Sequence, residues 1–373
     1  MSDGSLWIGV MSGTSLDGVD AVLASISAAG HLQVVNHVHN PMPGLLREAC
    51  LELNQTTTNE LHRAQVTANH LAHWYSQAVQ DLIKQAGCAR EEIRAIGVHG
   101  QTVRHHPVPM TDDPWSAYTV QLNNPALLAE LSGVDVVAQF RERDIAAGGQ
   151  GAPLVPAFHR QMFAKPDQHT AVVNIGGIAN VSWLAADGQC LGWDSGPGNM
   201  LLDAWCDQHT GQPWDDQGQW AASGKVQSDL LQAWLNDPYF KQQGVKTSGR
   251  EYFNMTWLQA RTPHLHEHAP ADVQASLVAL TAQTIVDSLP NCPDHVLLCG
   301  GGALNQTLTS ALSARLPRTS LANTDAAGLP VMQVEAAAFA WLAWAWHQRK
   351  PGNWPAATGA LGLRILGALH PAG

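Results

Sequence analysis

The stretch LWIGVMSGTSLDGVDAVLASIS at residues 6–27 decides how the fold is interpreted. Apolar runs at 6–10 and 21–26 flank small, hydroxyl and acidic residues, which is the pattern of two strands joined by a turn. The turn contains Gly13 and Gly18 together with Asp17 and Asp20. It is either an ordinary hairpin turn or a loop shaped around a ligand, and the rest of the chain must decide between them.

The following sequence places this hairpin at the start of an α/β protein. LQVVNHVH at 32–39 adds a third strand, and residues 44–88 carry apolar positions at helical spacing that end at Gly87. From IRAIGVHG at 93–100 onward, predicted strands and helices alternate, which favours an α/β fold. The last helix is expected in VEAAAFAWLAWAWHQRK at 334–350, before a Pro/Gly-rich tail.

Chain length and an interruption near the middle predict two domains. The 373 residues exceed the usual size of one domain, and GGQGAPLVP at 148–156 breaks the alternation. TAVVNIGGIANVSWLA at 170–185 then repeats the opening order of strand, glycine turn and strand. We expect domain I at residues 1–147 and 336–373, domain II at 148–335, and a cleft between them.

Composition excludes several classes of protein. The net charge of −11 would repel nucleic acid and anionic membranes. No segment reaches the roughly 18 apolar residues of a membrane span, and the first residues lack the features of a signal peptide. The six cysteines form no CxxC pair, so we expect reduced thiols in a cytoplasmic protein that binds small molecules.

Three glycine turns favour the ligand loop over the plain hairpin. Each follows an apolar strand, and they contain Gly13 with Gly18, Gly176 with Gly177, and residues 300–302. Glycine lets backbone N–H groups approach phosphate oxygens closely, and a helix N-terminus adds a favourable dipole. No GxxxxGK[ST] stretch is present, so this is not a P-loop. Two hairpins could instead hold a polyphosphate from both sides.

This order of turns resembles the actin-like superfamily of sugar kinases and chaperone ATPases, and within it the anhydro-N-acetylmuramic acid kinase family. The similar stretches are long and extend nearly from end to end. They are MSGTSLDGVD at 11–20, HGQTVRH at 99–105, FRERDIAAGGQGAPLVPAFH at 140–159, NIGGIANVS at 174–182, WDSGPGNMLLDAW at 193–205, TSGREYFN at 247–254, CGGGALN at 299–305 and TGALG at 358–362. The resemblance implies a two-domain actin-like ATPase fold in which each domain is a mixed β-sheet flanked by helices.

The resemblance also implies an activity, the ATP-dependent phosphorylation of 1,6-anhydro-N-acetylmuramic acid in cell-wall recycling. Water opens the anhydro bridge at the anomeric carbon, O6 receives the γ-phosphoryl group, and the products are N-acetylmuramic acid 6-phosphate and ADP. The implied cofactors are ATP and Mg²⁺, and the implied assembly is a homodimer. Two alternatives stay open: a kinase for an ordinary free amino sugar, and an ATP-switched binding protein without sugar chemistry.

Asp194 is the expected catalytic residue. The reaction needs a base that deprotonates water, and the resemblance carries the role of the family's catalytic aspartate to Asp194 in WDSGPGN. We expect this residue at the end of the strand CLGW, before the turn SGPGN and the helix MLLDAW. The alternative is an aspartate that caps this helix.

The glycine turns supply the expected nucleotide-binding residues. Asp17 is predicted to orient Mg²⁺ through water, with an Asx turn as the alternative, whereas a structural role is an equal alternative for Asp20. Thr14 and Ser15 can donate hydroxyl groups to phosphate. The expected ATP-binding residues are Gly13, Thr14, Ser15, Leu16, Asp17, Gly18, Val19, Asp20, Gly176, Gly177, Gly300, Gly301 and Gly302.

A second group of residues is expected to bind the sugar. Arginine suits the lactyl carboxylate of the implied substrate, although RERD at 141–144 could also be a surface ion-pair network. Glu142 departs from a uniformly basic pattern there. The resemblance makes Glu335 a ligand of sugar hydroxyls rather than a dipole partner in a first helical turn. The expected substrate-binding residues are Gln101, Arg141, Arg143, Asp144 and Glu335.

Several histidines could suggest a metal site, but we do not expect them to bind a metal. His99 is predicted to be a hydrogen-bonded core residue. HLHEH at 264–268 has prolines close by, which favours a loop or a short helix on the surface. We interpret His105 and His106 in the same way.

Overall fold

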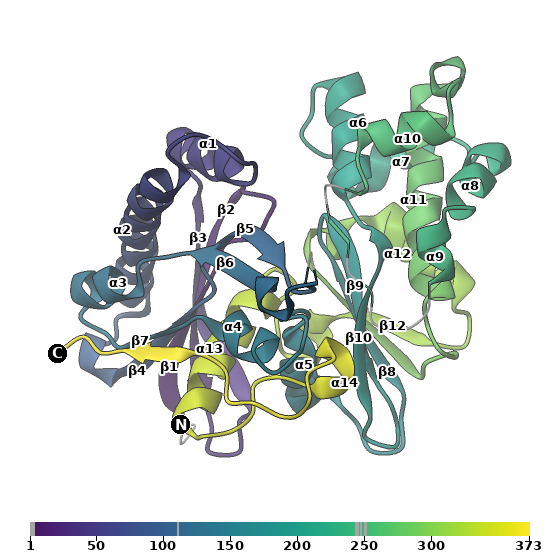
Figure 1. The fold of residues 1–373 in the computed structure, drawn as a ribbon. Helices are drawn as coiled ribbons and strands as arrows, with labels where there is room; N and C mark the ends of the chain where they lie inside the picture. The colour runs from purple at the N-terminus through teal and green to yellow at the C-terminus, as the bar shows by residue number, and fades with distance from the viewer. Residues whose placement is uncertain (1–3, 110–111, 243–245, 247, 250–251) are drawn as a thin grey trace. The chain divides into compact units, whose positions relative to one another are not determined.

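The computed structural model describes residues 4–109, 112–242, 246, 248–249 and 252–373. The chain divides into two compact units, unit 1 with Met1–Met162 and Gln333–Gly373, and unit 2 with Phe163–Met332. Each unit contains a mixed β-sheet flanked by helices (Figure 1), so the predicted two-domain α/β class is confirmed. Thr247, Arg250 and Glu251 of the TSGREYFN stretch lie outside the described residues.

The unit boundaries differ from those that the sequence predicts. The first falls after Met162 rather than after residue 147, and the second after Met332 rather than after residue 335. Residues 148–162 stay with unit 1 because they contact its other parts. The Gln161 side chain donates to the carbonyl of Ala29 at 3.2 Å, and the Phe158 ring packs on Trp341 with centroids 6.0 Å apart.

The sheet of unit 1 has the strand order β13-β7-β4-β1-β2-β3. The first three strands form the expected antiparallel meander, and β4 and β7 add parallel strands beside β1. β13 pairs antiparallel with β7, so the tail completes the sheet, which the sequence did not predict. The strands are β1 (Ser5–Met11), β2 (Gly18–Ile26), β3 (Leu32–Pro41), β4 (Ile93–Val98), β7 (Val136–Ala138) and β13 (Ala368–His370). A separate antiparallel hairpin joins β5 (Gln101–His106) and β6 (Tyr118–Leu122).

The helices of unit 1 end where the sequence predicts. Gly87 and Gly133 follow α2 and α3 in the left-handed conformation, with φ of 64° and 65°, which glycine adopts without steric cost. The helices of unit 1 are α1 (Gly44–Leu53), α2 (Glu60–Ala86), α3 (Pro125–Ser132), α4 (Phe140–Ile145), α5 (Val155–Phe163), α13 (Val334–His347) and α14 (Pro355–Thr358). The last residue of α5 lies just past the boundary of the unit.

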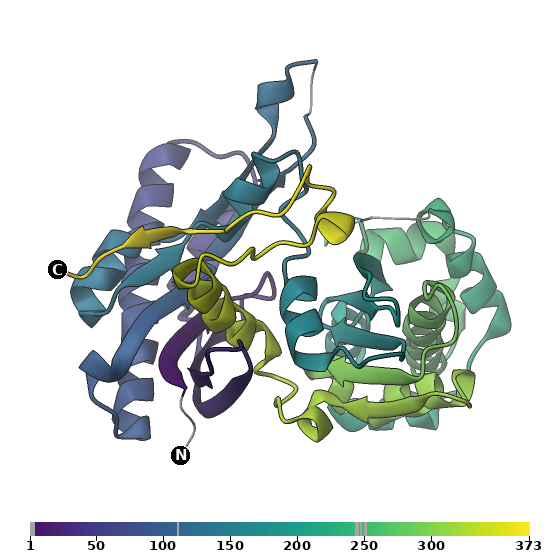
Figure 2. The same cartoon turned by 90° about the horizontal axis from the view of Figure 1, so that it is seen from below.

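Two glycines let helix α13 pack directly on the sheet of unit 1 (Figure 2). Gly9 on β1 and Gly97 on β4 are neighbours in the parallel ladder. A Cβ on Gly9 would lie 1.8 Å from the carbonyl oxygen of Ala336, and one on Gly97 would lie 2.0 Å from that of Phe339. The close approach buries α13 on nearly all sides, as expected for a helix without a polar face.

Unit 2 repeats the strand plan of unit 1. Its sheet has the order β10-β9-β8-β11-β12, in which β8, β9 and β10 form an antiparallel meander and β11 and β12 extend it in parallel. The repeated hairpin start predicted from the sequence is therefore confirmed. The strands are β8 (Thr170–Ile175), β9 (Ile178–Leu184), β10 (Cys190–Pro197), β11 (His295–Cys299) and β12 (Ser320–Asn323).

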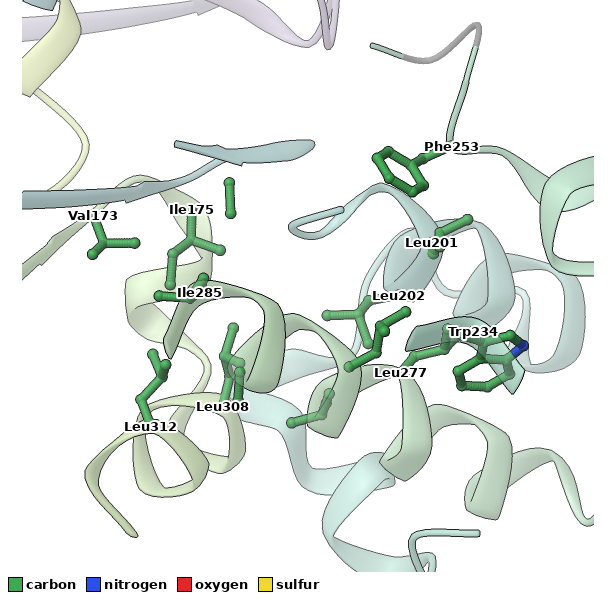
Figure 3. Close-up of a cluster of buried hydrophobic side chains, with 14 of the residues drawn as sticks. Val173, Ile175, Leu201, Leu202, Trp234, Phe253, Leu277, Ile285, Leu308 and Leu312 are labelled. Atoms are coloured by element: carbon green, nitrogen blue, oxygen red, sulfur yellow. The ribbon is translucent and has the colours of Figure 1, made fainter. Parts of the chain in front are cut away.

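The core of unit 2 lies between its sheet and its helices (Figure 3). Val173 and Ile175 of β8 lie toward Ile285 of the long helix α11 and Leu308 of α12, and Leu277 belongs to the same core further along α11. The helices are α6 (Met200–Thr210), α7 (Gln219–Ser223), α8 (Ser228–Leu235), α9 (Pro238–Lys241), α10 (Met255–Arg261), α11 (Pro270–Asp287) and α12 (Gln306–Arg315). Within the described part of the chain, no helix combines the length and apolarity that a membrane crossing requires.

We expect acid to weaken unit 1 through His159, a residue of α5 that is 1% exposed. Burial lowers the pKa of His159 to about 3. Between pH 3 and about 6.5, the folded state therefore binds fewer protons there than the unfolded state, and stability falls as the pH falls. Urea unfolding at pH 7, 6 and 5 should show a loss for this residue of about 0.7 kcal/mol from pH 7 to 6, and a loss approaching about 1.4 kcal/mol per pH unit below pH 6. His159→Leu should remove that part of the slope, and an unchanged slope would contradict the prediction.

Candidate active site

The loop between β1 and β2 is a tight turn with exposed polar side chains. The amide of Leu16 donates to the carbonyl of Gly13 at 3.2 Å, and Leu16 has a φ of 57° and a buried side chain. Thr14, Ser15 and Asp17 are exposed. Oδ1 of Asp17 accepts from the Ser15 hydroxyl at 2.7 Å and from the amide of Gly18 at 2.9 Å, whereas an Asx turn would use the amide two residues on. Because the Leu16 and Val19 side chains belong to the core, only their backbones can contact a ligand.

Four of the expected ATP-binding glycines have no packing reason to be glycine. A Cβ placed on any of them would meet no atom closer than 3.4 Å, and none has a φ in the left-handed region. The open space beside these backbones is what close approach of a phosphate requires. These glycines are Gly13, Gly176, Gly177 and Gly301.

The other three glycines of these turns are required by the protein itself. A Cβ on Gly18 would lie 2.4 Å from the His39 ring, and one on Gly302 would lie 2.3 Å from the Ile175 side chain. Gly300 has a φ of +77°, which side chains rarely adopt. The turns therefore mix glycines that packing or backbone conformation requires with glycines that have open space beside them, a difference that the sequence alone could not show.

The second and third glycine turns lie together in unit 2. The amides of Gly198 and Asn199 donate to the carbonyls of Gly177 and Gly176 at 2.9 and 2.7 Å, where α6 begins. A Cβ on Gly302 would also approach the Asn199 side chain at 2.9 Å. The amides of the two residues before α6 and of Met200, its first residue, are thus bound by the turn at Gly176 and Gly177.

Asp194 lies on β10, the outermost strand of its sheet, and three groups from outside the sheet bind it. Its amide donates to the carbonyl of Lys246 at 2.9 Å, and its carbonyl accepts from the Tyr239 hydroxyl at 2.9 Å. Its Oδ2 accepts from the amide of Ser248 at 2.9 Å. The carboxylate is half-buried and held in one direction.

Asp194 does not end its strand, which corrects the expectation from the sequence. β10 continues to Pro197, with a shift of register against β9 between Asp194 and Gly196. Pairing continues beyond this shift, since Gly196 pairs with Ala179, and the Ser195 hydroxyl donates to the carbonyl of the same residue at 3.1 Å. The N-cap of α6 is Asn199. The arrangement therefore differs from the alternative in which Asp194 caps the helix.

Arg141 is fixed by two acceptors in unit 1. Its Nε donates to His99 Nε2 at 2.9 Å, and its guanidinium donates to the carbonyl of Gly151 at 2.7 Å. Burial and the Arg141 charge hold the pKa of His99 well below its usual value, so His99 accepts as a neutral ring. His99 is a buried, hydrogen-bonded histidine, as predicted.

The β5–β6 hairpin presents buried polar atoms that no described residue satisfies. The side chain of Gln101 is 1% exposed, its Nε2 donates to the carbonyl of Gly13 at 3.1 Å, and its Oε1 has no partner there. Gln121 Oε1 and both amide atoms of Asn123 also lack partners among the described residues. Their Cβ atoms lie 3.3 and 3.2 Å from the Cβ position of Gly100, on one face. Because such atoms are costly to bury, this face fits a polar ligand.

Asp144 and Arg143, two of the expected sugar ligands, are in different surroundings. Asp144 is 0% exposed, and its Oδ1 accepts from Asn353 and Thr358 at 2.8 Å each. Its Oδ2 accepts from the amide of Gly151 at 2.8 Å. The carboxylate thus anchors the C-terminal segment to α4. Arg143 is exposed and has no hydrogen bond or ion pair with the described residues.

Asp20 is held by two histidines on the neighbouring strand. Its Oδ1 lies 2.9 Å from His37 Nε2 and 3.1 Å from His39 Nδ1. Asp20 on β2 is paired with His39 on β3, and His37 lies two residues away on the same strand, so the contacts stabilise the hairpin. This geometry agrees with the alternative in which Asp20 has a structural role.

Glu335 lies in the first turn of α13, within the electric field of three charged residues. Burial raises the pKa of Glu335, the charge of Arg141 opposes that rise, and the charges of Asp20 and Asp17 add to it. A cation held near these three carboxylates would relieve their repulsion. Across the described ranges, no group of three or more His, Cys, Asp or Glu residues forms a ready metal site, so protein side chains alone do not build one.

Sequence reasoning missed Gln121, Asn123, His105, Tyr239 and Lys246. His105 was expected in a loop or a short helix on the surface, yet it lies half-buried on strand β5, and its Nδ1 is 2.9 Å from the Thr119 hydroxyl. Burial and the Arg141 charge lower the pKa of His105 to about 4, so it is neutral at pH 7. The alternation of apolar and polar residues in YTVQL at 118–122 was the one signal in the sequence that could have predicted strand β6.

Comparison with known proteins gives one family over the whole chain. The family model described as anhydro-N-acetylmuramic acid kinase matches residues 5–372. The anhydro-N-acetylmuramic acid kinase of Bordetella petrii is 52% identical over 376 residues, covering 99% of this chain and 97% of that protein. The enzyme of the same name from Chromobacterium violaceum is 49% identical over 371 residues, covering 98% and 99%.

A solved structure with a similar arrangement is the activator of the 2-hydroxyisocaproyl-CoA dehydratase from Clostridium difficile with bound ADPNP. The similarity covers 92% of this chain and 96% of that chain, at 15% identity and a TM-score of 0.44.

Proposed function

The chain belongs to the anhydro-N-acetylmuramic acid kinase family, and we propose that it uses ATP to phosphorylate 1,6-anhydro-N-acetylmuramic acid in cell-wall recycling. The observation that carries this proposal is the family match across residues 5–372. Two features of the site support it independently. Four glycines leave open space beside their backbones, and one face of the β5–β6 hairpin holds unsatisfied polar atoms.

Asp194 is the proposed base. Its carboxylate takes a proton from water while the water oxygen bonds to the anomeric carbon and the bond from that carbon to O6 breaks. The electron pair left on O6 attacks the γ-phosphorus of ATP, and the bond to the β-phosphate oxygen breaks to release ADP. One carboxylate is sufficient because phosphorus, rather than a proton, captures the departing O6. The proton on Asp194 then returns to solvent.

Sugar recognition is assigned to unit 1. Arg141 is the proposed partner of the lactyl carboxylate, because His99 and Gly151 already fix its guanidinium. Gln101 and Glu335 are proposed to bind sugar hydroxyls. For Asp144 we propose an indirect contribution, since its carboxylate oxygens accept from other parts of unit 1. Arg143 is the weaker candidate for sugar binding because no described residue orients its guanidinium group.

ATP is proposed to bind through the three glycine turns, with Thr14 and Ser15 as additional donors. Mg²⁺ would be held by the nucleotide and by water, with Asp17 on its protein side. The chemistry that the ion would supply there is neutralisation of the phosphate charge. The acidic field of Asp17, Asp20 and Glu335 is consistent with a cation at this place.

The family resemblance also supports a homodimer in the cytoplasm, where ATP is available. None of the six cysteines, all of which lie in the described part of the chain, forms a disulfide, which is consistent with a reducing compartment.

The coupled hydrolysis is tested by running the reaction in ¹⁸O-labelled water. We expect one ¹⁸O at the anomeric oxygen of the phosphorylated product and none at O6, because water attacks the anomeric carbon. An unlabelled phosphorylated product from a free amino sugar would instead indicate an ordinary sugar kinase. ATP hydrolysis without any sugar product would indicate an ATP-switched binding protein.

A further inference from the structure

The outer edge of β10 leaves Asp194 without a strand on one side. β10 pairs only with β9 in the described sheet, so its outward-facing main-chain groups need other partners. Two residues from outside the sheet supply them, since Tyr239 binds the Asp194 carbonyl and Lys246 binds its amide. The position of the proposed base therefore depends on residues that do not belong to the sheet that carries it.

Tyr239 is itself fixed on several sides. It is 4% exposed, and its ring meets the Phe253 ring edge-on with centroids 5.2 Å apart. The ammonium group of Lys246 lies 4.6 Å from the centre of the Tyr239 ring and donates to the Tyr239 carbonyl at 3.3 Å. Burial, with the charge of Asp194 as a lesser cause, raises the pKa of the Tyr239 hydroxyl, so this group remains a donor at neutral pH.

Asp237 anchors the short helix that carries Tyr239. Asp237 is 2% exposed, and its Oδ1 accepts from the amide of Tyr239 at 2.8 Å and from the Tyr252 hydroxyl at 2.7 Å. Its Oδ2 accepts from Trp257 Nε1 at 2.9 Å and pairs with Arg261. Burial opposes ionisation of Asp237, but these donors outweigh it and keep its pKa below the usual value. The anchor therefore remains charged at neutral pH.

We propose that Tyr239 is a positioning residue for catalysis, and that its hydroxyl fixes the main chain of Asp194 so that the carboxylate points at the attacking water. The inference rests on the proposed role of Asp194 as the base. With both main-chain groups and Oδ2 bound, the side chain has one direction, and loss of one bond permits others. The hydroxyl touches no reacting atom in this scheme, so its contribution should appear in kcat and not in binding.

The test is Tyr239→Phe, which keeps the buried ring and removes only the hydroxyl. We expect kcat to fall about 10-fold, with the KM values for ATP and sugar within about twofold of the wild type. Tyr252→Phe is the matched control. It removes a hydroxyl from the same aromatic cluster, but Asp237 keeps three other donors, so kcat should stay within about twofold.

A double-mutant cycle with Asp194→Asn separates positioning from a general loss of structure. If Tyr239 acts through the base, adding Tyr239→Phe to Asp194→Asn should cause no further loss in the residual rate. Equal losses in both backgrounds, equal losses in Tyr239→Phe and Tyr252→Phe, or an unchanged kcat would overturn the inference. Thermal unfolding and ATP binding identify any variant that fails to fold, and the cycle is then run with Tyr239→Leu, which also lacks the hydroxyl and is smaller than the native side chain. If Asp194→Asn itself keeps full turnover, the proposed function of Asp194 fails instead.

Discussion

Asparagine in place of Asp194 is expected to lower kcat by about 10²- to 10⁴-fold and to leave ATP affinity within about twofold. The asparagine side chain has nearly the same shape, and its oxygen can still accept from the Ser248 amide. The bonds to Tyr239 and Lys246 involve only the main chain, so they remain. The variant therefore removes the basic group with little change in position. ADP release measures kcat, and calorimetry measures ATP binding.

The matched control for this variant is Asp187→Asn. Asp187 precedes β10 in the same unit, and its Oδ1 accepts from the amide of Gln189 at 2.9 Å. It makes the same kind of contact as Asp194 but lies in the turn between β9 and β10, so kcat should stay within about twofold. Full turnover in Asp194→Asn would remove Asp194 from the role of base.

Alanine at Gly177 is expected to raise the KM for ATP about 10-fold or more without loss of stability. A Cβ on Gly177 would meet nothing closer than the Cβ of Met200 at 3.7 Å, so the folded chain accommodates it. A phosphate that approaches the backbone closely would meet the added methyl group. Initial rates at varied ATP concentration measure the change, and thermal unfolding measures the stability.

Two further glycine variants serve as controls for this prediction. Gly44→Ala adds a Cβ that also meets nothing within 4 Å, far from the turns in sequence, and should change neither property. Gly302→Ala places a Cβ 2.3 Å from the Ile175 side chain and should lower the melting temperature by several degrees. An unchanged KM for ATP in Gly177→Ala would argue against phosphate contact at this turn.

Local sequence was sufficient for the elements whose pattern and end signals agree. The first hairpin, the helix that ends at Gly87 and the hairpin around Gly176 all combine apolar periodicity with a glycine at the right place. The stretch at 148–156 misled the placement of the domain boundary, because its glycines and prolines also suit a loop. Contacts with other parts of the chain keep it with unit 1, since the amide of Gly151 donates to Asp144 and the amide of Gln150 donates to the carbonyl of Thr358.

Residue types identified the candidate chemistry but not the partner of each side chain. Arg141 and Arg143 are equivalent in sequence, yet one is fixed by His99 and Gly151 and the other is exposed. Asp144 has a suitable charge for a sugar ligand, but Asn353 and Thr358 engage it from the other end of the chain. Contacts across such separations leave no signal in a local pattern.

The sequence by itself determined the family, the α/β class and the identity of the proposed base, because long motifs and short-range periodicity carry that information. The tertiary structure alone decided which glycines leave space for a ligand, which acidic groups serve the fold and what holds Asp194 in place. The physical reason is distance along the chain. A close contact or a satisfied carboxylate depends on residues that only folding brings together, as when Tyr239 reaches the carbonyl of Asp194 at the edge of β10.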